Sequence, residues 1–187
     1  MNDDSLLKKA QTGDVYAFEE LLKTHSPRMF MLALRLMNNR EDALDLTQEA
    51  WIRIYRGLPG FRGQSAFSTW IYRIVYNTCL DELRKRKNKT TVSADALADK
   101  GISAVVTNSM QIPEEHFENT TRGKMLREAL AQLSEDHLSV IVLRDVQGFS
   151  YGEIAEILGQ SLGTVKSRIS RARIALAAKL QENSELK

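Results

Sequence analysis

The chain has 187 residues, and 26 Lys and Arg against 24 Asp and Glu give it a formal net charge of +2 at pH 7. That length fits one or two small domains, and so small a net charge does not by itself indicate a nucleic-acid partner. The single cysteine, Cys79, excludes an internal disulfide and a cysteine-rich metal site, and it fits a reducing, cytoplasmic setting. No apolar run approaches the ~20 residues that span a bilayer, and the first residues lack a signal-peptide pattern, so membrane insertion is not expected.

Helical periodicity dominates the N-terminal half of the sequence. The whole chain has only 3 prolines and 10 glycines, and its apolar residues recur at helical rather than alternating spacing, which predicts an all-α fold. Helices are expected over 14–22, 27–37, 40–55 and about 69–84. The second is apolar nearly all round, which is typical of a central, buried helix. A loop rich in Gly and Pro, residues 57–63, precedes the fourth.

The fourth predicted helix and the loop before it combine aromatic side chains with Arg and Asn. Aromatic rings stack on unpaired bases, amides hydrogen-bond base edges and guanidinium groups bind phosphates, so the stretch 61–87 suits single-stranded nucleic acid. Trp70, Tyr72 and Tyr76 would equally suit ordinary core or boundary positions, where aromatic residues commonly pack. The residues alone favour neither binding of unpaired bases nor ordinary packing of these aromatic side chains.

A stretch without sustained periodicity extends from 90 to about 118. It is rich in Ser, Thr, Ala and Asn, and its charges are mostly acidic, which is typical of a flexible linker. The chain is therefore expected to form two small helical domains, residues 1–88 and 119–187, joined by a flexible linker at 89–118. Whether the two domains pack against each other stays open.

The C-terminal domain is expected to contain a helix-turn-helix. Ser150, with Glu153 three residues later, forms a capping-box pattern at the start of a short helix, and Gly159 suits its end. Ser161 is a good N-cap for the helix that follows. A helix pair this small cannot fold alone, and two further amphipathic helices within 125–146 would supply the missing core.

The second helix of this pair divides into an apolar stripe and a polar face, with no acidic residue from 159 to 181. Small polar side chains allow close approach to base edges and cations bind phosphates, as in a recognition helix in the DNA major groove. The alternative, a solvated charged face, would usually mix both signs. The candidate DNA-binding residues are Gly163, Thr164, Lys166, Ser167, Arg168, Ser170, Arg171 and Arg173.

Three motifs occur in the order of a known family. They are DALDLTQEAW at 42–51, FSTWI at 67–71 and GTVKSRISRAR at 163–173. Together they resemble bacterial RNA polymerase sigma factors, and more narrowly the extracytoplasmic-function (ECF) group, whose short members carry only the second and fourth sigma domains. The resemblance covers almost the whole chain. Primary sigma factors carry adjacent aromatics where this chain has Trp70 and Ile71, which implies weaker strand separation here.

The resemblance implies a role for each motif. The first would bind core RNA polymerase at the β′ clamp, the chain would also contact the β flap of the polymerase, and the recognition helix would read the minus-thirty-five promoter element. The stretch 61–84 would bind the melted minus-ten element, and its loop 62–66 would hold a flipped base of the non-template strand. Polymerase-binding candidates are Asp45, Gln48 and Glu49, and melted-element candidates are Arg62, Gln64, Ser65, Trp70, Arg73, Asn77 and Arg84.

The implied function is promoter-specific initiation of transcription in a stress or envelope response, with no metal, cofactor or catalytic residue of its own. The acidic linker would thread the polymerase cleft, and an anti-sigma factor would regulate the protein in the cytoplasm or hold it at the membrane. Two other interpretations are a helix-turn-helix transcriptional regulator that acts without core polymerase and a helical adaptor without DNA affinity. The stretch 61–87 argues against the regulator, because a sensor domain needs no basic, aromatic surface.

Overall fold

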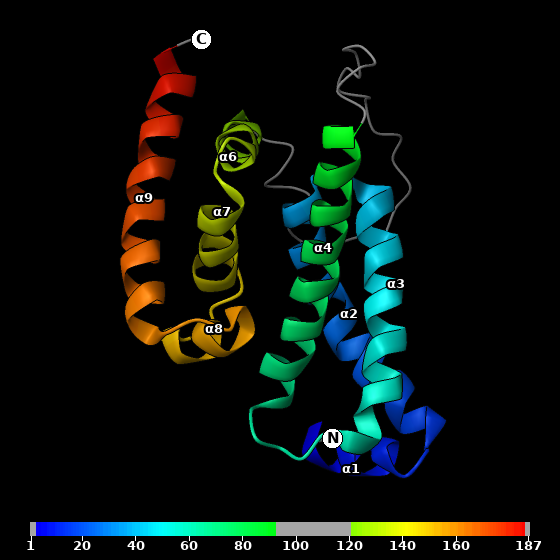
Figure 1. The fold of residues 1–187 in the computed structure, drawn as a ribbon. Coiled ribbons are helices and arrows are strands. Elements are labelled where there is room, and N and C mark those ends of the chain that lie inside the picture. Colours follow the sequence, from blue (N-terminus) through cyan, green and yellow to red (C-terminus); the bar gives the residue numbers. More distant parts are fainter. Residues whose placement is uncertain (1–2, 93–120, 186–187) are drawn as a thin grey trace.

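The computed structural model describes residues 3–92 and 121–185, and every regular element within them is a helix. The N-terminal domain contains α1 (Asp3–Gln11), α2 (Val15–Met37), α3 (Arg40–Gly57), the 3-10 turn η1 (Leu58–Gly60) and α4 (Phe67–Val92). The C-terminal domain contains α6 (Thr121–Ala131), α7 (Glu135–Ile141), the π-helical turn η2 (Val142–Val146), α8 (Tyr151–Leu158) and α9 (Leu162–Glu185). The predicted all-α class with two helical domains is confirmed (Figure 1). Most of the predicted linker, and with it the expectation about the polymerase cleft, lies outside the described residues.

Helix α2 is continuous where two helices, 14–22 and 27–37, were predicted. Pro27 lies inside it and removes a backbone donor, which usually ends or kinks a helix. Leu21 and Leu32, on either side of Pro27, are fully buried, and burial of such a side chain contributes about 1.5–3 kcal/mol. The prediction was wrong because burial of the apolar residues on both sides outweighs the local cost of one proline.

Helices α3 and α4 pack against α2 and against each other, and α1, which was not predicted, covers one end of α2. Helix α4 continues beyond its predicted end at 84, to Val92. Near that end Arg86 forms ion pairs with Asp42 of α3 and with Glu82, and its hydrogen bond lowers the pKa of Asp42. Cys79 is buried as expected, and burial raises its thiol pKa to about 12, so the thiol stays protonated.

The two domains pack side by side, with α4 against α8 and α2 against α7 and η2 (Figure 1). Tyr72 of α4 is only 2% exposed, and its ring meets that of Phe149 edge-on at a centroid distance of 4.7 Å. The Tyr72 hydroxyl donates to Gln147 Oε1 at 3.0 Å, and Gln147 Nε2 donates to the Arg28 carbonyl at 3.3 Å. One glutamine amide therefore links α2, α4 and the turn before α8.

His25 gives the N-terminal domain a pH-dependent contact. Its Nε2 lies 3.1 Å from Asp3 Oδ2 of α1, and its ring meets Phe67 edge-on. Burial lowers the pKa of His25 below its ordinary value of 6.5, although Asp3 opposes that shift. The unfolded chain therefore takes up the proton first, and the stability from neutral His25, complete above pH 6.5, declines as the pH falls below it.

We expect the free energy of unfolding to drop between about pH 7.5 and about pH 5.5, and to drop less in His25→Gln, which cannot take up the proton. Urea titrations of both proteins across this range measure the two slopes. Parallel slopes would show that His25 carries none of the pH dependence.

Candidate DNA- and polymerase-binding surfaces

The helix-turn-helix is built by the caps that the sequence predicts. Ser150 Oγ accepts from the Glu153 amide at 3.3 Å, and the Glu153 carboxylate accepts from the Ser150 amide at 2.8 Å, so the capping box is complete. Gly159 ends α8 in the left-handed region, at φ +63°. Ser161 Oγ then accepts from the Thr164 amide at 3.1 Å and starts α9. These contacts fix the turn between the two helices.

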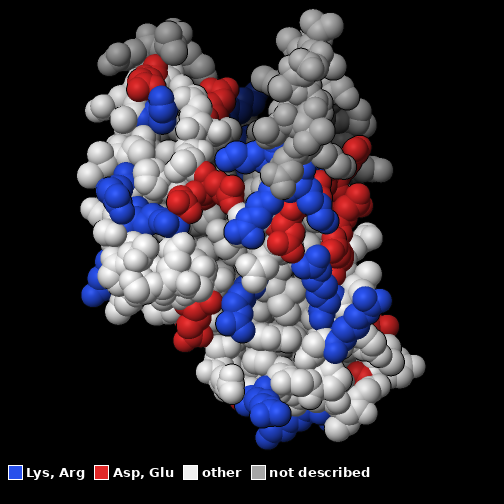
Figure 2. Space-filling view, viewed as in Figure 1, with Lys and Arg blue, Asp and Glu red and all other residues white. Residues whose placement is uncertain are grey.

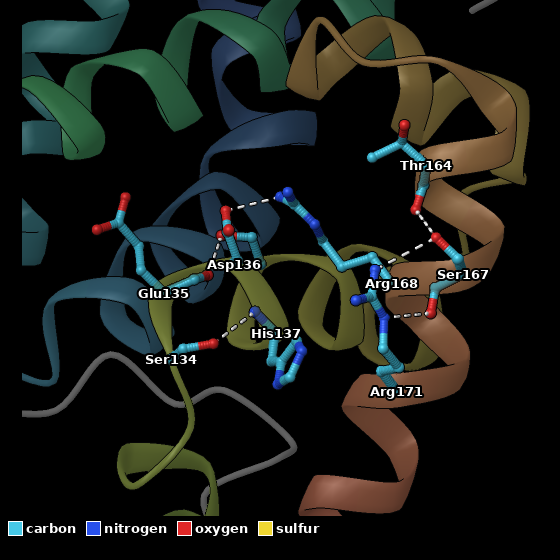
Figure 3. A network of polar contacts seen from close by, with 9 residues as sticks. Ser134, Glu135, Asp136, His137, Thr164, Ser167, Arg168 and Arg171 are labelled. Carbon is cyan, nitrogen blue, oxygen red and sulfur yellow. Dashed lines mark hydrogen bonds and ion pairs between the residues drawn. The ribbon is translucent and has the colours of Figure 1, made fainter.

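The outward face of α9 carries small polar and basic side chains. Thr164, Ser167 and Arg171 follow one another at helical spacing and are all exposed. Arg171 folds back along the helix, with Nε donating to the Ser167 carbonyl at 3.3 Å (Figure 3). The remaining exposed candidates beside this face are Gly163, Lys166, Ser170 and Arg173. This face of α9 therefore presents small polar side chains and one arginine that is folded back on its own helix.

Two of the predicted DNA-binding cations are engaged by carboxylates of their own domain. Arg168 Nη1 lies 2.6 Å from Asp136 Oδ1 of α7, and the Arg168 side chain is only 18% exposed (Figure 3). Arg173 Nε donates to Asp145 of η2 at 3.2 Å. The spacing of the two arginines in the sequence already indicates that they lie beside the buried stripe of α9. Arg168 comes three residues after Val165, and Arg173 four after Ile169, so both flank the buried stripe rather than the outward face.

The candidates for melted DNA lie on the loop after η1 and along α4. Arg62 and Gln64 are exposed, Ser65 is partly exposed, and Gly63 turns the loop at φ +69°. Arg73, Asn77 and Arg84 form an exposed row on one side of α4. Trp70 is half-buried: its ring contacts Phe61 at 4.9 Å and Phe67 at 5.9 Å. The Trp70 ring therefore packs against Phe61 at the start of the loop, whereas Arg62 and Gln64 are exposed to solvent.

Tyr72 and Tyr76 take the boundary positions that the sequence left as an even alternative. Both rings are buried where α4 meets the C-terminal domain, and Tyr76 lies close enough to Ser139 for a hydrogen bond that influences its pKa. Burial raises the pKa of both phenols, so both stay neutral. Neither ring is open to a base in this arrangement.

The exposed face of α3 is both polar and apolar. Asp45 and Gln48 are exposed, while Glu49 accepts from Arg53 Nη2 at 2.6 Å, and Arg53 also reaches Asp81 of α4. Glu49 is therefore already paired within α3, with an arginine that also contacts α4. Beside Gln48 the sequence reasoning missed an exposed apolar stripe that follows helical spacing: Leu44, Ile52 and Tyr55.

An exposed apolar stripe with polar neighbours is typical of a protein-binding surface. These three residues are out of phase with the buried residues of the same helix, such as Ala43, Leu46 and Ala50, and the structure is needed to show which of the two sets is buried.

The candidate residues thus form three separate surfaces on α9, on α4 with its preceding loop, and on α3, rather than one pocket. On the face drawn in Figure 2, the Lys and Arg side chains of the N-terminal domain have Asp and Glu among several of them. Among the described side chains no three His, Cys, Asp or Glu residues are arranged to hold a metal ion. None of the helices in the described ranges has the length and apolarity needed to cross a bilayer.

We expect Arg168→Ala to lower the free energy of unfolding by up to about 1 kcal/mol, because Asp136 loses its partner. Arg171→Ala should change it much less, because Arg171 contacts only its own helix. Urea unfolding of the two variants, which remove the same charge from the same helix, gives the comparison. Equal losses would mean that the Asp136 pair adds nothing to stability.

Comparison with known families identifies both domains. The sigma-70 region 2 family matches residues 21–89, and the sigma-70 region 4 family matches residues 123–176. The first match includes α3, the loop and most of α4, and the second includes the helix-turn-helix.

Among solved structures, the sigma factor RpoE of Bartonella quintana, determined with the anti-sigma factor NepR, aligns with a TM-score of 0.70 at 27% identity, over 89% of this chain and 98% of that one.

Curated relatives extend along nearly the whole chain. The ECF RNA polymerase sigma-E factor of Escherichia coli K12 is 36% identical over 183 residues, which cover 97% of this chain and 95% of that protein. The RNA polymerase sigma-H factor of Pseudomonas aeruginosa is 34% identical over 183 residues, 96% and 94% of the two chains. The factor SigW of Bacillus subtilis is 32% identical over 179 residues, 94% and 95%. The chain therefore belongs to the bacterial RNA polymerase sigma factors, in their extracytoplasmic-function group.

Proposed function

We propose that this chain binds core RNA polymerase and directs it to initiate transcription at a specific set of promoters, in a stress or envelope response. The observation that carries the proposal is the presence of three exposed surfaces of different chemistry on one two-domain frame. A transcription initiation factor needs one for duplex DNA, one for the opened strand and one for the enzyme. The chemistry belongs to the polymerase, and this chain contributes binding and position.

The exposed face of α9 is suited to the minus-thirty-five element. Thr164 and Ser167 are small enough for base edges to approach, and Arg171 can donate two hydrogen bonds to a guanine. Because Arg168 and Arg173 already pair with carboxylates, we assign direct base reading to Arg171 and phosphate binding to Lys166. With domains at residues 1–88 and 119–187, the helix that binds the upstream element lies in a domain of its own.

The loop 61–66 and the exposed row on α4 are suited to the melted minus-ten element. Arg62 and Gln64 provide a cation and an amide at the loop, and Arg73, Asn77 and Arg84 continue the polar track along the helix. We assign the α3 surface, with Asp45, Gln48, Glu49 and the neighbouring apolar stripe, to the β′ clamp of the polymerase. Its apolar part favours a protein partner over mere solvation.

We further propose a contact of the C-terminal domain with the β flap and regulation by a separate anti-sigma factor. Relatives of similar fold have been solved with anti-sigma proteins, as the RpoE–NepR complex illustrates. The site of action would be the cytoplasm, where the polymerase works, with the anti-sigma factor able to hold the chain at the membrane.

Reconstitution with core RNA polymerase and a library of promoter fragments tests the function. Run-off transcripts that depend on this chain are expected. Arg171→Ala should lower transcription from promoters with the upstream element roughly 5- to 150-fold, the equivalent of ~1–3 kcal/mol for one good base contact. Lys124→Ala, which removes an exposed cation from α6, is the matched control and should leave the transcript level unchanged.

If the chain binds duplex DNA but yields no polymerase-dependent transcripts, it is a transcriptional regulator instead. If it shows neither activity, it is an adaptor. Wild-type transcript levels in Arg171→Ala would show that Arg171 does not take part in binding the upstream element.

The packed arrangement of the domains must open on such a promoter. Elements about 25 base pairs apart are separated by about 85 Å of B-DNA. Two touching domains of this size, each about 30 Å across, cannot reach that far. Residues 93–120 could span up to about 90 Å if extended, which is sufficient. We therefore infer that the contact through Gln147 is made in the free protein and released at the promoter.

Fluorescence transfer between dyes on Thr24→Cys and Glu156→Cys, two exposed positions in different domains, measures this opening. Transfer should be high in the free protein, lower in Gln147→Ala, and lowest in the polymerase–promoter complex. Gln132→Ala, which removes an exposed amide from α6's end, is the control. Unchanged transfer in the promoter complex would contradict the opening.

A further inference from the structure

The loop that begins after α3 is held by a residue that lies far from it in the sequence but beside it in the fold. Gln11, the last residue of α1, donates from Nε2 to the Phe61 carbonyl at 2.7 Å and to the Leu58 carbonyl at 3.3 Å. Its partners lie 50 and 47 residues further along the chain. The loop start has one hydrogen bond of its own among those described, from the Phe61 amide to the Leu58 carbonyl. Gln11 therefore supplies two of the contacts that hold its backbone.

Helix α1 is itself a rigid support for Gln11. Leu6 and Ala10 are buried in the domain core, and Asp3 contacts His25 of α2. Gln11 is partly buried, so the amide is held on the domain rather than moving in solvent. A glutamine amide nitrogen carries two donor hydrogens, so it can donate to two neighbouring carbonyls at once.

Aromatic packing also holds the loop start. Phe61 lies against Trp70 at a centroid distance of 4.9 Å. Gly57 approaches the same ring so closely that a Cβ there would lie 3.2 Å from it. The loop start is thus held by both the Gln11 amide and the Trp70 ring, and the exposed segment with Arg62 and Gln64 follows directly.

We propose that Gln11 is a positioning residue for capture of the flipped base in the melted element. It touches no DNA itself. It holds the Leu58 and Phe61 carbonyls, and thereby sets where Arg62 and Gln64 leave the domain. The proposal rests on the assignment of the loop to the melted element.

Two substitutions separate hydrogen bonding from mere size. Gln11→Glu keeps the shape but puts a carboxylate, which cannot donate, against two carbonyls. Gln11→Lys restores a donor at similar reach. Gln132→Glu makes the same chemical change in the C-terminal domain, where the Gln132 amide contacts only Asn183 among the described side chains, and serves as control.

The first measurement is hydrogen–deuterium exchange of the full-length protein. Residues 60–66 should exchange about 10-fold faster in Gln11→Glu, since two hydrogen bonds of ordinary strength are lost. Exchange in α3 and α4 and the affinity for core polymerase should stay at the wild-type level, while the unfolding midpoint should fall only modestly, as the loss of two hydrogen bonds requires. Gln11→Lys should return the loop to within about twofold of wild type.

The second measurement uses single-stranded oligonucleotides that the wild-type holoenzyme selects from a random pool. Each position of the selected sequence is replaced by an abasic nucleotide in turn. Wild type should lose about 10-fold or more in affinity at the captured base. Gln11→Glu should lose only about twofold there, while its binding to duplex upstream DNA stays unchanged. A general loss of folding would instead weaken binding to intact and abasic strands alike.

These outcomes distinguish a failure of the role of Gln11 from a failure of the assignment of the loop to the melted element. If Gln11→Glu shows the wild-type exchange rate in the loop and the wild-type loss of affinity at the captured base, Gln11 has no positioning role. That conclusion holds whatever the loop binds. Absence of any abasic effect in the wild-type holoenzyme would overturn the assignment of the loop, and the positioning role with it.

Discussion

Helix α4 must satisfy three different surroundings at once, and the rest of the structure depends on how it does so. Ile71, Val75 and Cys79 are buried in the core of the N-terminal domain. Tyr72 lies against the C-terminal domain, where its ring and its hydroxyl both find partners. Arg73 remains in solvent with its polar neighbours. A helix that is packed on two sides leaves one exposed row, so the position of that row is fixed by what the other two sides bury.

Charge on α9 is divided in a similar way between structure and recognition. Arg168 and Arg173 pair with Asp136 and Asp145, whereas Arg171 contacts only its own helix. A count of cations therefore overstates the part of this helix that can bind DNA. The two pairs also join α9 to α7 and η2. Arg168 and Arg173 thus serve the packing of α9, and Arg171 is left on its exposed face.

The elements predicted correctly were those set by contacts within one or two helical turns. The Ser150–Glu153 box, the Gly159 end and the Ser161 cap involve neighbours in sequence, so their pattern is visible without a fold. Helix α2 failed because its continuity across Pro27 depends on burial by other helices. The α3 stripe was missed because an apolar residue is marked as exposed only once the buried face of its helix is known.

The sequence by itself determined the all-α class, the helix-turn-helix and the family, because periodicity, caps and motifs are local properties of the chain. Only the tertiary structure decided which side chains remain available. It paired Arg168 with Asp136, enclosed Tyr72 between the domains and brought Gln11 to the Phe61 carbonyl, 50 residues away. Each of these contacts joins residues far apart in sequence. Side-chain partners at such separations are set by how whole helices pack, and no local pattern encodes them.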